Sequence, residues 1–97
     1  MATYIILGQF TEQGIRNVKD SPKRADAMKE TAKKHSVTVK DVYWTLGHYD
    51  VVTVVDAPDD AAVTAMLLST GSLGNVRTQC LRAFNASEMG AVIGKMK

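Results

Sequence analysis

The chain has few of the cysteines, prolines, aromatic residues and excess charges on which several protein classes depend. Its 97 residues include one cysteine, two prolines and 6% aromatic side chains, and the formal net charge is only +2. A single cysteine, Cys80, excludes a disulfide framework within the chain, and such sparing use of cysteine is typical of a reducing compartment. No apolar run approaches the roughly 20 residues that span a membrane, and the first residues show no signal-peptide pattern. We therefore expect a cytoplasmic protein with no membrane partner.

The same scarcity argues against nucleic acid and metal as partners. No basic stripe is interleaved with stacking aromatic residues on a predicted strand, so no nucleic-acid interface is expected. The two histidines, His35 and His48, belong to no Cys/His cluster with ligand spacing, and we expect no metal site and no cofactor. Apolar residues make up 45% of the chain and charged residues 23%, as in an ordinary globular protein. The length predicts a single domain over residues 1–97.

The hydrophobic pattern predicts four strands and two main helices. The strands are expected at residues 3–10, 37–46, 51–56 and 76–84. The first helix should run over 22–34, with Ser21 as its N-cap and Ala25, Met28 and Ala32 on its apolar face. The second helix should start at 58–60 and end near Gly71, with an inner stripe at positions 63, 66, 67 and 70. Residues 11–20 are predicted to be a polar loop, and 87–97 a weak helix capped by Ser87.

This order of elements, β-α-β-β-α-β, predicts a ferredoxin-like α+β fold. Such a fold is a four-stranded antiparallel sheet with both helices on one face. The first and third strands are apolar on both faces, whereas a sheet face in water usually shows polar residues in alternation. An exposed apolar face of that size is an association site, and we expect a homodimer that packs sheet against sheet with two-fold symmetry. The alternative is a monomer whose open face is partly apolar.

A hairpin tip, Gly47-His48-Tyr49-Asp50, precedes a run of five β-branched residues at 51–55. This motif resembles the GYD-domain family, and residues 11–24 and 71–84 are similar to the same family. The resemblance implies the dimeric α/β-barrel architecture, a pair of ferredoxin-like domains. It implies no activity, since no catalytic residues are established for that family. The architecture is shared by small monooxygenases, muconolactone-isomerase-like enzymes and ligand-sensing domains of transcription regulators, and so it does not fix a function.

The hairpin tip also offers the first candidates for chemistry. Along extended backbone, His48 and Asp50 would point the same way and could relay a proton, with Tyr49 as a further acid or base. A turn would break that alternation. The structural interpretation is that Gly47 supplies the turn, Asp50 bonds backbone, and Tyr49 packs at the hairpin or dimer edge.

A second cluster lies before and within the start of the first helix. Its cations and hydroxyl could hold a phosphate or carboxylate beside free helix N–H groups; the candidates are Arg16, Asn17, Lys19, Ser21, Lys23 and Arg24. The spacing matches no phosphate-binding loop. The alternative is that Glu12 and Asp20 pair with these cations while the loop packs over a sheet edge or a partner subunit.

Three residues on the predicted strands complete the candidates. Arg77 could bind a substrate carboxylate if its face lines a pocket, or be a solvated charge at a sheet edge. Trp44, the only tryptophan, is expected to anchor the core or the dimer interface, or to form an aromatic wall of a ligand pocket. Cys80 is expected to be a small buried apolar residue and not a nucleophile.

Two classes of function fit these residues. The first is a homo-oligomeric regulatory or assembly module that binds a small anionic or aromatic ligand. The second is a small cofactor-independent enzyme, a monooxygenase or isomerase, in which the hairpin residues act as acid or base and Arg77 orients the substrate. The feature that discriminates between the two classes is a closed, mostly apolar pocket with convergent polar groups.

Overall fold

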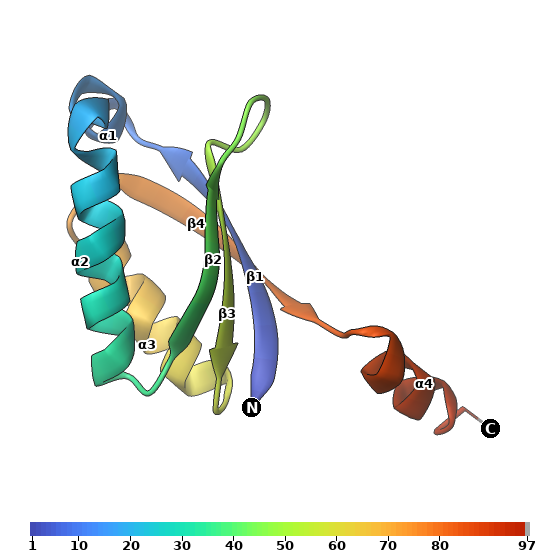
Figure 1. Cartoon of the computed structure of the whole chain (residues 1–97). Coiled ribbons are helices and arrows are strands. Elements are labelled where there is room, and N and C mark those ends of the chain that lie inside the picture. Colours follow the sequence, from blue (N-terminus) through green and yellow to red (C-terminus); the bar gives the residue numbers. More distant parts are fainter. Residues whose placement is uncertain (97) are drawn as a thin grey trace.

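The computed structural model describes residues 1–96, and within them a four-stranded antiparallel sheet carries two long helices on one face (Figure 1). The strands lie in the order β2-β3-β1-β4, so that β1 and β3 are central. The elements along the chain are β1 (Ala2–Phe10), α1 (Glu12–Arg16), a 3-10 turn η1 (Val18–Asp20), α2 (Ser21–Lys34), β2 (Thr38–Trp44), β3 (Val51–Ala57), α3 (Asp60–Gly71), β4 (Val76–Ala83) and α4 (Ala86–Ile93). The predicted ferredoxin-like α+β fold is confirmed.

The register of the sheet decides which side chains lie under the helices. Tyr4 pairs with Val55 and Arg82, and Ile6 pairs with Thr53 and Cys80. Because side chains alternate between the faces of a strand, the even-numbered residues of β1 and β4 face the helices. The odd-numbered residues of these two strands form the opposite side, which no element covers in Figure 1.

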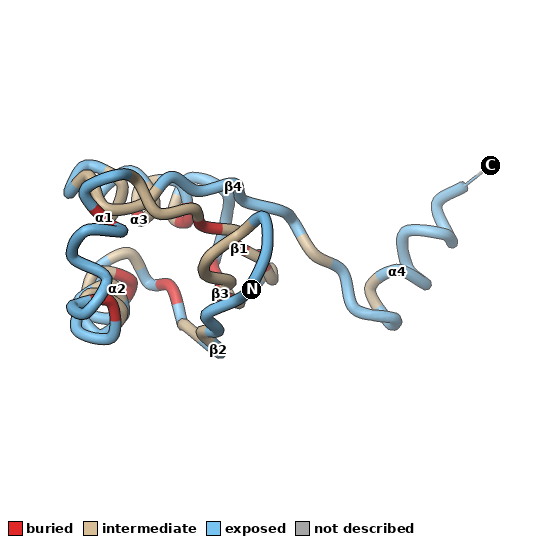
Figure 2. Tube along the Cα trace, turned by 90° about the horizontal axis from the view of Figure 1, so that it is seen from above, coloured by how far each residue is buried: buried red, intermediate tan, exposed pale blue. Residues whose placement is uncertain are grey.

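The buried core occupies one half of the space between sheet and helices. Its residues are fully or almost fully buried: Tyr4, Ile6, Ala32, Val37, Val55, Ala57, Val63 and Met66. Most of them belong to the end of the sheet where β1 begins and β3 finishes. Figure 2 shows the buried positions gathered between the sheet and α2 and α3. The other half, towards the β2–β3 hairpin, is less densely filled and contains the cavity described below.

Several predicted boundaries were wrong. The predicted loop 11–20 contains α1 and η1, because Thr11 caps α1 by accepting from the Gly14 N–H and Arg16 pairs with Glu12 one turn away. Ser21 is not the N-cap of α2; Asp20 takes that position, and the Ser21 hydroxyl has a distant partner instead.

The predicted ends of the hairpin and of the later helices also change. β2 stops at Trp44, so Leu46 lies fully exposed in a loop that is longer than predicted. Gly71 is the last residue of α3 and the left-handed turn residue is Gly74, with φ of +85°. Asn85, in a capping box with Glu88, starts α4 in place of Ser87. Lys97, the predicted end of that helix, lies outside the described residues.

Candidate functional site

A cavity of about 130 Å³ lies between the sheet and helices α2 and α3, at the hairpin end of the fold. The floor consists of side chains from all four strands, including Ile6, Phe10, Val42 and Val51, and the roof of Met28, Leu67 and others from the helices. An engineered cavity of similar size and apolar lining in another protein admits benzene. The space therefore suits a small apolar body, and polar groups at a few points on its wall decide what else can bind.

Arg24 supplies the positive charge on this wall. Its guanidinium donates hydrogen bonds to the carbonyl oxygens of Asn17, at 2.9 Å, and Gly14, at 3.2 Å. It also lies over the Phe10 ring, 5.8 Å from the centroid. These contacts fix the plane of the guanidinium and use two of its five N–H donors. The remaining donors are free to bind an anion, and no carboxylate within residues 1–96 forms an ion pair with Arg24.

Trp44 and Ser21 close the wall on the β2 side. The indole Nε1 donates to the Ser21 hydroxyl at 2.8 Å, joining the end of β2 to the first residue of α2. Ser21 is buried, whereas Trp44 is 48% exposed. The indole therefore lines the cavity with part of its surface still in water. An exposed indole held by a hydrogen bond can act as an aromatic wall without being part of the core.

Thr70 contributes the one buried side-chain polar atom in residues 1–96 that has no hydrogen-bond partner. Its hydroxyl oxygen is buried, and Thr70 belongs to the cavity lining on α3. A buried hydroxyl without a partner costs free energy. A ligand with a hydrogen-bonding atom in reach of this oxygen would recover that cost.

The end of the cavity near the hairpin is closed where α1 meets the loop before β4. Gly14 is buried there, and a Cβ on it would lie 1.9 Å from the Asn75 carbonyl oxygen. The backbone N–H of Thr11 donates to the same oxygen at 3.1 Å, and Gln13 bonds Leu73 and Asn75 through its side-chain amide. This close approach requires glycine, and it seals one wall, since Leu73 and Asn75 line the cavity.

The rest of the predicted anion cluster lies apart from the cavity. Arg16 pairs with Glu12 on the surface, and the side chain of Asn17 donates to the Gln13 carbonyl. Lys19 and Lys23 are exposed. Of the predicted ligand-binding residues, the fold brings together Ser21, Arg24 and Trp44 at one wall. Arg77 lies between Val76 and Thr78, which line the cavity, and so faces the other side of the sheet.

The hairpin residues are also outside the cavity. The Asp50 carboxylate accepts the Phe10 N–H at 2.8 Å, and the Tyr49 hydroxyl donates to Gln79 at 2.8 Å. His48 is exposed, with its ring edge-on to Tyr49 at 4.9 Å. His48 and Asp50 therefore have different surroundings and share no partner, and the tip bends over the uncovered side of the sheet.

Two groups with shifted pKa values lie at the far end of the fold, near the start of α3. The hydrogen bond from the Tyr4 hydroxyl to Asp60, assisted by burial, raises the pKa of Tyr4 to about 12. Burial, followed by the negative charge of Asp60, raises the pKa of Cys80. A thiol with a raised pKa is a poor nucleophile at neutral pH. Cys80 is exposed as a whole residue, so the prediction that it would be buried was wrong.

The uncovered side of the sheet is the second candidate surface. We call it the open sheet face and define it by its apolar residues, which are Ile5, Leu7, Tyr43, Val52, Val54 and Leu81. Tyr43 is 56% exposed and Leu81 40%, and the other four are partly exposed. Central strands that lie in water on one face normally carry polar residues there.

Comparison with known proteins supports the family suggested by the sequence motifs. The model of the GYD domain matches residues 4–93. The chain belongs to the GYD-domain family. A relative from Thermus thermophilus, named "Glutamine synthetase and cystathionine beta-lyase binding protein", is 33% identical over 90 residues, which cover 92% of this chain and 95% of the relative.

Solved structures show where else the GYD-domain fold occurs. A feast or famine regulatory protein of M. tuberculosis, in complex with L-methionine, superposes with a TM-score of 0.67 at 19% identity, over 89% of this chain and 52% of the regulator. A leucine response regulatory protein of Mycobacterium tuberculosis superposes with a TM-score of 0.66 at 19% identity, over 88% of this chain and 51% of the regulator. This chain spans about half the length of those two regulators. A crystal structure of a Thermus thermophilus protein superposes with a TM-score of 0.57 at 27% identity, over 89% of this chain and 96% of that protein.

Some components of this GYD domain's cavity were not assigned by sequence reasoning. Phe10 lies on the same face of β1 as Ile6 and lines the cavity with it, but its contact with Arg24 depends on a fold that joins residues 14 positions apart. Thr70 gave a local signal, since it is a polar residue within the predicted apolar stripe of α3.

No helix among residues 1–96 has the length and apolar character of a membrane span. Those residues also contain no group of three or more metal-ligating side chains.

Proposed function

We propose that this GYD-domain protein is a self-associating regulatory module that binds a small ligand in the cavity between sheet and helices. The observation that carries the proposal is the cavity lining. It is mostly apolar, and its polar groups include the Arg24 guanidinium, the Trp44–Ser21 pair and the unpartnered Thr70 hydroxyl, beside Thr53, Asn75 and Thr78. Mostly apolar walls with a few fixed polar groups are the usual composition of a small-molecule site.

The lining favours a small carboxylate with an aromatic or short aliphatic body. The apolar walls and the volume suit a body of about the size of benzene. The free donors of Arg24 suit a carboxylate, because guanidinium N–H groups match its two oxygens. Phe10 and Trp44 provide aromatic surfaces at the same end of the cavity.

The positions of the acid and base candidates favour binding over catalysis. His48, Tyr49 and Asp50 do not line the cavity, and Arg24 is the only ionisable residue on its wall within residues 1–96. A general acid or base must come within hydrogen-bond distance of the substrate. The alternative function, a cofactor-independent monooxygenase or isomerase, has no such group at this site.

The relatives support a regulatory output. The Thermus thermophilus relative is named for binding two enzymes, and two of the neighbours in structure are named as regulatory proteins, one of them in complex with an amino acid. We propose that ligand binding in this chain controls contacts with itself and with other proteins. The open sheet face is the surface on which a second copy would pack, because it exposes an apolar area on two central strands.

The test combines native mass spectrometry with matched variants. Protein purified from cells should show a dimer with a reproducible added mass that is lost on denaturation. Benzoate should raise the melting temperature, and benzamide, its neutral analogue, should raise it less.

The substitution Ala25→Leu adds three carbons inside the cavity, and Ala61→Leu adds the same atoms on the exposed face of α3. Ala25→Leu should abolish the benzoate shift and Ala61→Leu should preserve it. An equal shift in both variants would show that benzoate binds elsewhere, and the ligand part of the proposal would fail.

A further inference from the structure

Helix α4 stands away from the rest of the molecule. In Figure 1 it lies on the side of the sheet opposite to α2 and α3, beyond the end of β4, and in Figure 2 it is almost entirely exposed. The Cα radius of gyration is 14.5 Å and the longest extent is 51 Å. A compact domain of this length has a radius of gyration of about 12.5 Å. The extra extension comes from this terminal segment, residues 84–96, which we call the arm.

The exposed side of the arm is apolar in a helical pattern. Met89, Val92 and Ile93 in α4 and Met96 in the turn after it follow the i, i+3, i+4, i+7 spacing that places helical side chains on one face. They are 46%, 41%, 54% and 77% exposed. An eight-residue helix is far too short to be stable on its own in water, and packing of an apolar face provides most of the stability of such helices. The capping box at Asn85 fixes where α4 starts but provides no such packing.

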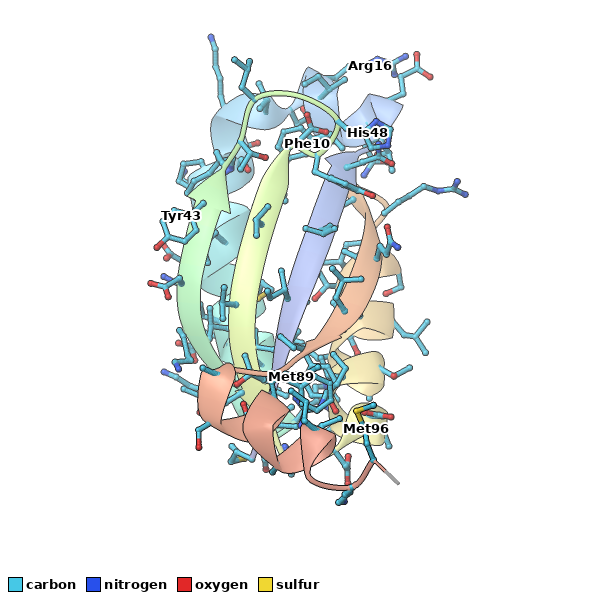
Figure 3. All side chains as sticks on the ribbon, turned by 90° about the vertical axis from the view of Figure 1, so that its right-hand side faces the viewer. Phe10, Arg16, Tyr43, His48, Met89 and Met96 are labelled. Atoms are coloured by element: carbon cyan, nitrogen blue, oxygen red, sulfur yellow. The ribbon has the colours of Figure 1, made fainter. Side chains whose placement is uncertain are left out.

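The arm is held at its base by several contacts. The Arg82 guanidinium lies 4.4 Å from the Phe84 ring centroid and 4.0 Å from the Glu88 carboxylate on α4. It also lies 5.7 Å from the Tyr4 ring centroid and bonds the Thr3 carbonyl on β1. A single side chain therefore connects the end of β4, the linker and the first turn of α4. Arg82 is on the helix-facing side of β4, opposite Tyr4, so its contacts fix the base of the arm but do not decide on which side α4 lies. Figure 1 and Figure 3 show that α4 lies on the side of the open sheet face, in front of one end of that face.

The arm lies beside the surface on which a second copy would pack. Four strands at about 4.8 Å spacing and about seven residues of 3.4 Å give a footprint of roughly 450 Å². A standard interface buries about 800 Å² of accessible surface on each partner. A flat footprint is smaller than the accessible surface of the side chains that cover it, so the two areas are not directly comparable. The apolar stripe of the arm adds to the apolar surface on the same side.

We propose that the arm is a docking element that packs its apolar stripe on a second copy of this chain seated on the open sheet face. Two-fold symmetry would make each copy contribute its arm to the other. The inference rests on the proposed self-association and adds the arm to the surface that a second copy contacts.

The test places a charge on either side of α4 in the full-length chain. Ile93→Asp changes the apolar stripe, and Ala91→Asp places the same carboxylate on the opposite side of the helix, where position 91 is also exposed. Sedimentation equilibrium over a wide concentration range would give the dimer dissociation constant of each variant. Ile93→Asp should raise it about tenfold or more relative to Ala91→Asp. Met96→Asp, at a second exposed position of the stripe, should act in the same direction.

Three results would overturn the proposal in different ways. Equal dissociation constants for the two variants in a dimeric protein would remove the arm from the interface and leave the open sheet face as the association surface. A protein that stays monomeric at the highest concentration would refute the sheet contact and the arm together. A loss of thermal stability in Ile93→Asp that is the same at every concentration would show that α4 packs on its own sheet.

Discussion

The contact between Gly14 and Asn75 allows a quantitative prediction for the wall of the cavity. In Gly14→Ala, the new Cβ would lie 1.9 Å from a backbone carbonyl oxygen and 2.9 Å from its carbon. Because those atoms are backbone, α1 and the loop before β4 must move apart by more than about 1 Å to reach ordinary contact. That movement would break the four hydrogen bonds that join Thr11 and Gln13 to residues 73–75.

The loss in stability follows from those bonds. Each hydrogen bond contributes about 1 kcal/mol net, so the loss is about 4 kcal/mol when all are broken. Alanine returns up to about 1 kcal/mol through its higher helix propensity. We therefore expect Gly14→Ala to lower the free energy of unfolding by about 3 kcal/mol, a large part of the roughly 5–15 kcal/mol typical of a domain.

Urea denaturation followed by Trp44 fluorescence and far-UV circular dichroism measures this loss. Gly71→Ala is the matched control, because a Cβ at this helical position meets nothing within 4 Å. The control should be neutral or slightly stabilising. A loss of less than about 1 kcal/mol in Gly14→Ala, with an unchanged denaturant slope, would refute the argument from close approach.

Three further predictions concern single side chains. Thr70→Val removes the unpartnered buried hydroxyl and should raise the free energy of unfolding of the ligand-free protein by about 1 kcal/mol, measured by urea denaturation. A lower free energy of unfolding in this variant would contradict the prediction. The pKa of Tyr4 is raised from 10 to about 12. The stability that the protonated Tyr4 hydroxyl adds to the folded state is therefore fully present below pH 10 and is lost as the pH rises towards 12. The stability difference between wild type and Tyr4→Phe should therefore shrink over that range, and a constant difference would contradict the role of Asp60. Gly47 has φ of +117°, so Gly47→Val should cost about 1–3 kcal/mol by strain, whereas an unchanged melting temperature would show that the turn accepts a side chain.

The fold could be predicted from the sequence because its signals are local and agree with one another. The short apolar and β-branched runs at residues 3–10 and 51–55 and the helical spacing of α2 indicate the order of elements. Helix α1 could not be predicted in the same way. Its five residues include Gly14, which is typical of a loop, and the reason for glycine is the backbone of Asn75, 61 positions later in the chain.

The candidate site was predicted only in part for a related reason. Arg24 and Trp44 were identified as single residues, but what they touch depends on contacts between distant segments. Ser21 has the composition of an N-cap, yet its hydroxyl bonds the Trp44 indole 23 positions away. A cavity is a property of the space between elements, and hydrophobic periodicity describes which face is buried without describing how well that face is filled.

Strand β4 connects the three surfaces that carry the proposed function. Its residues Val76 and Thr78 line the cavity, whereas Leu81 belongs to the open sheet face and the strand continues directly into the arm. β4 is also an edge strand, paired with β1 alone. An edge strand moves more easily than a central one, because only one ladder of hydrogen bonds holds it. A ligand that shifts β4 from the cavity side therefore also shifts the surface offered to a second copy, which is the physical connection that a regulatory module requires.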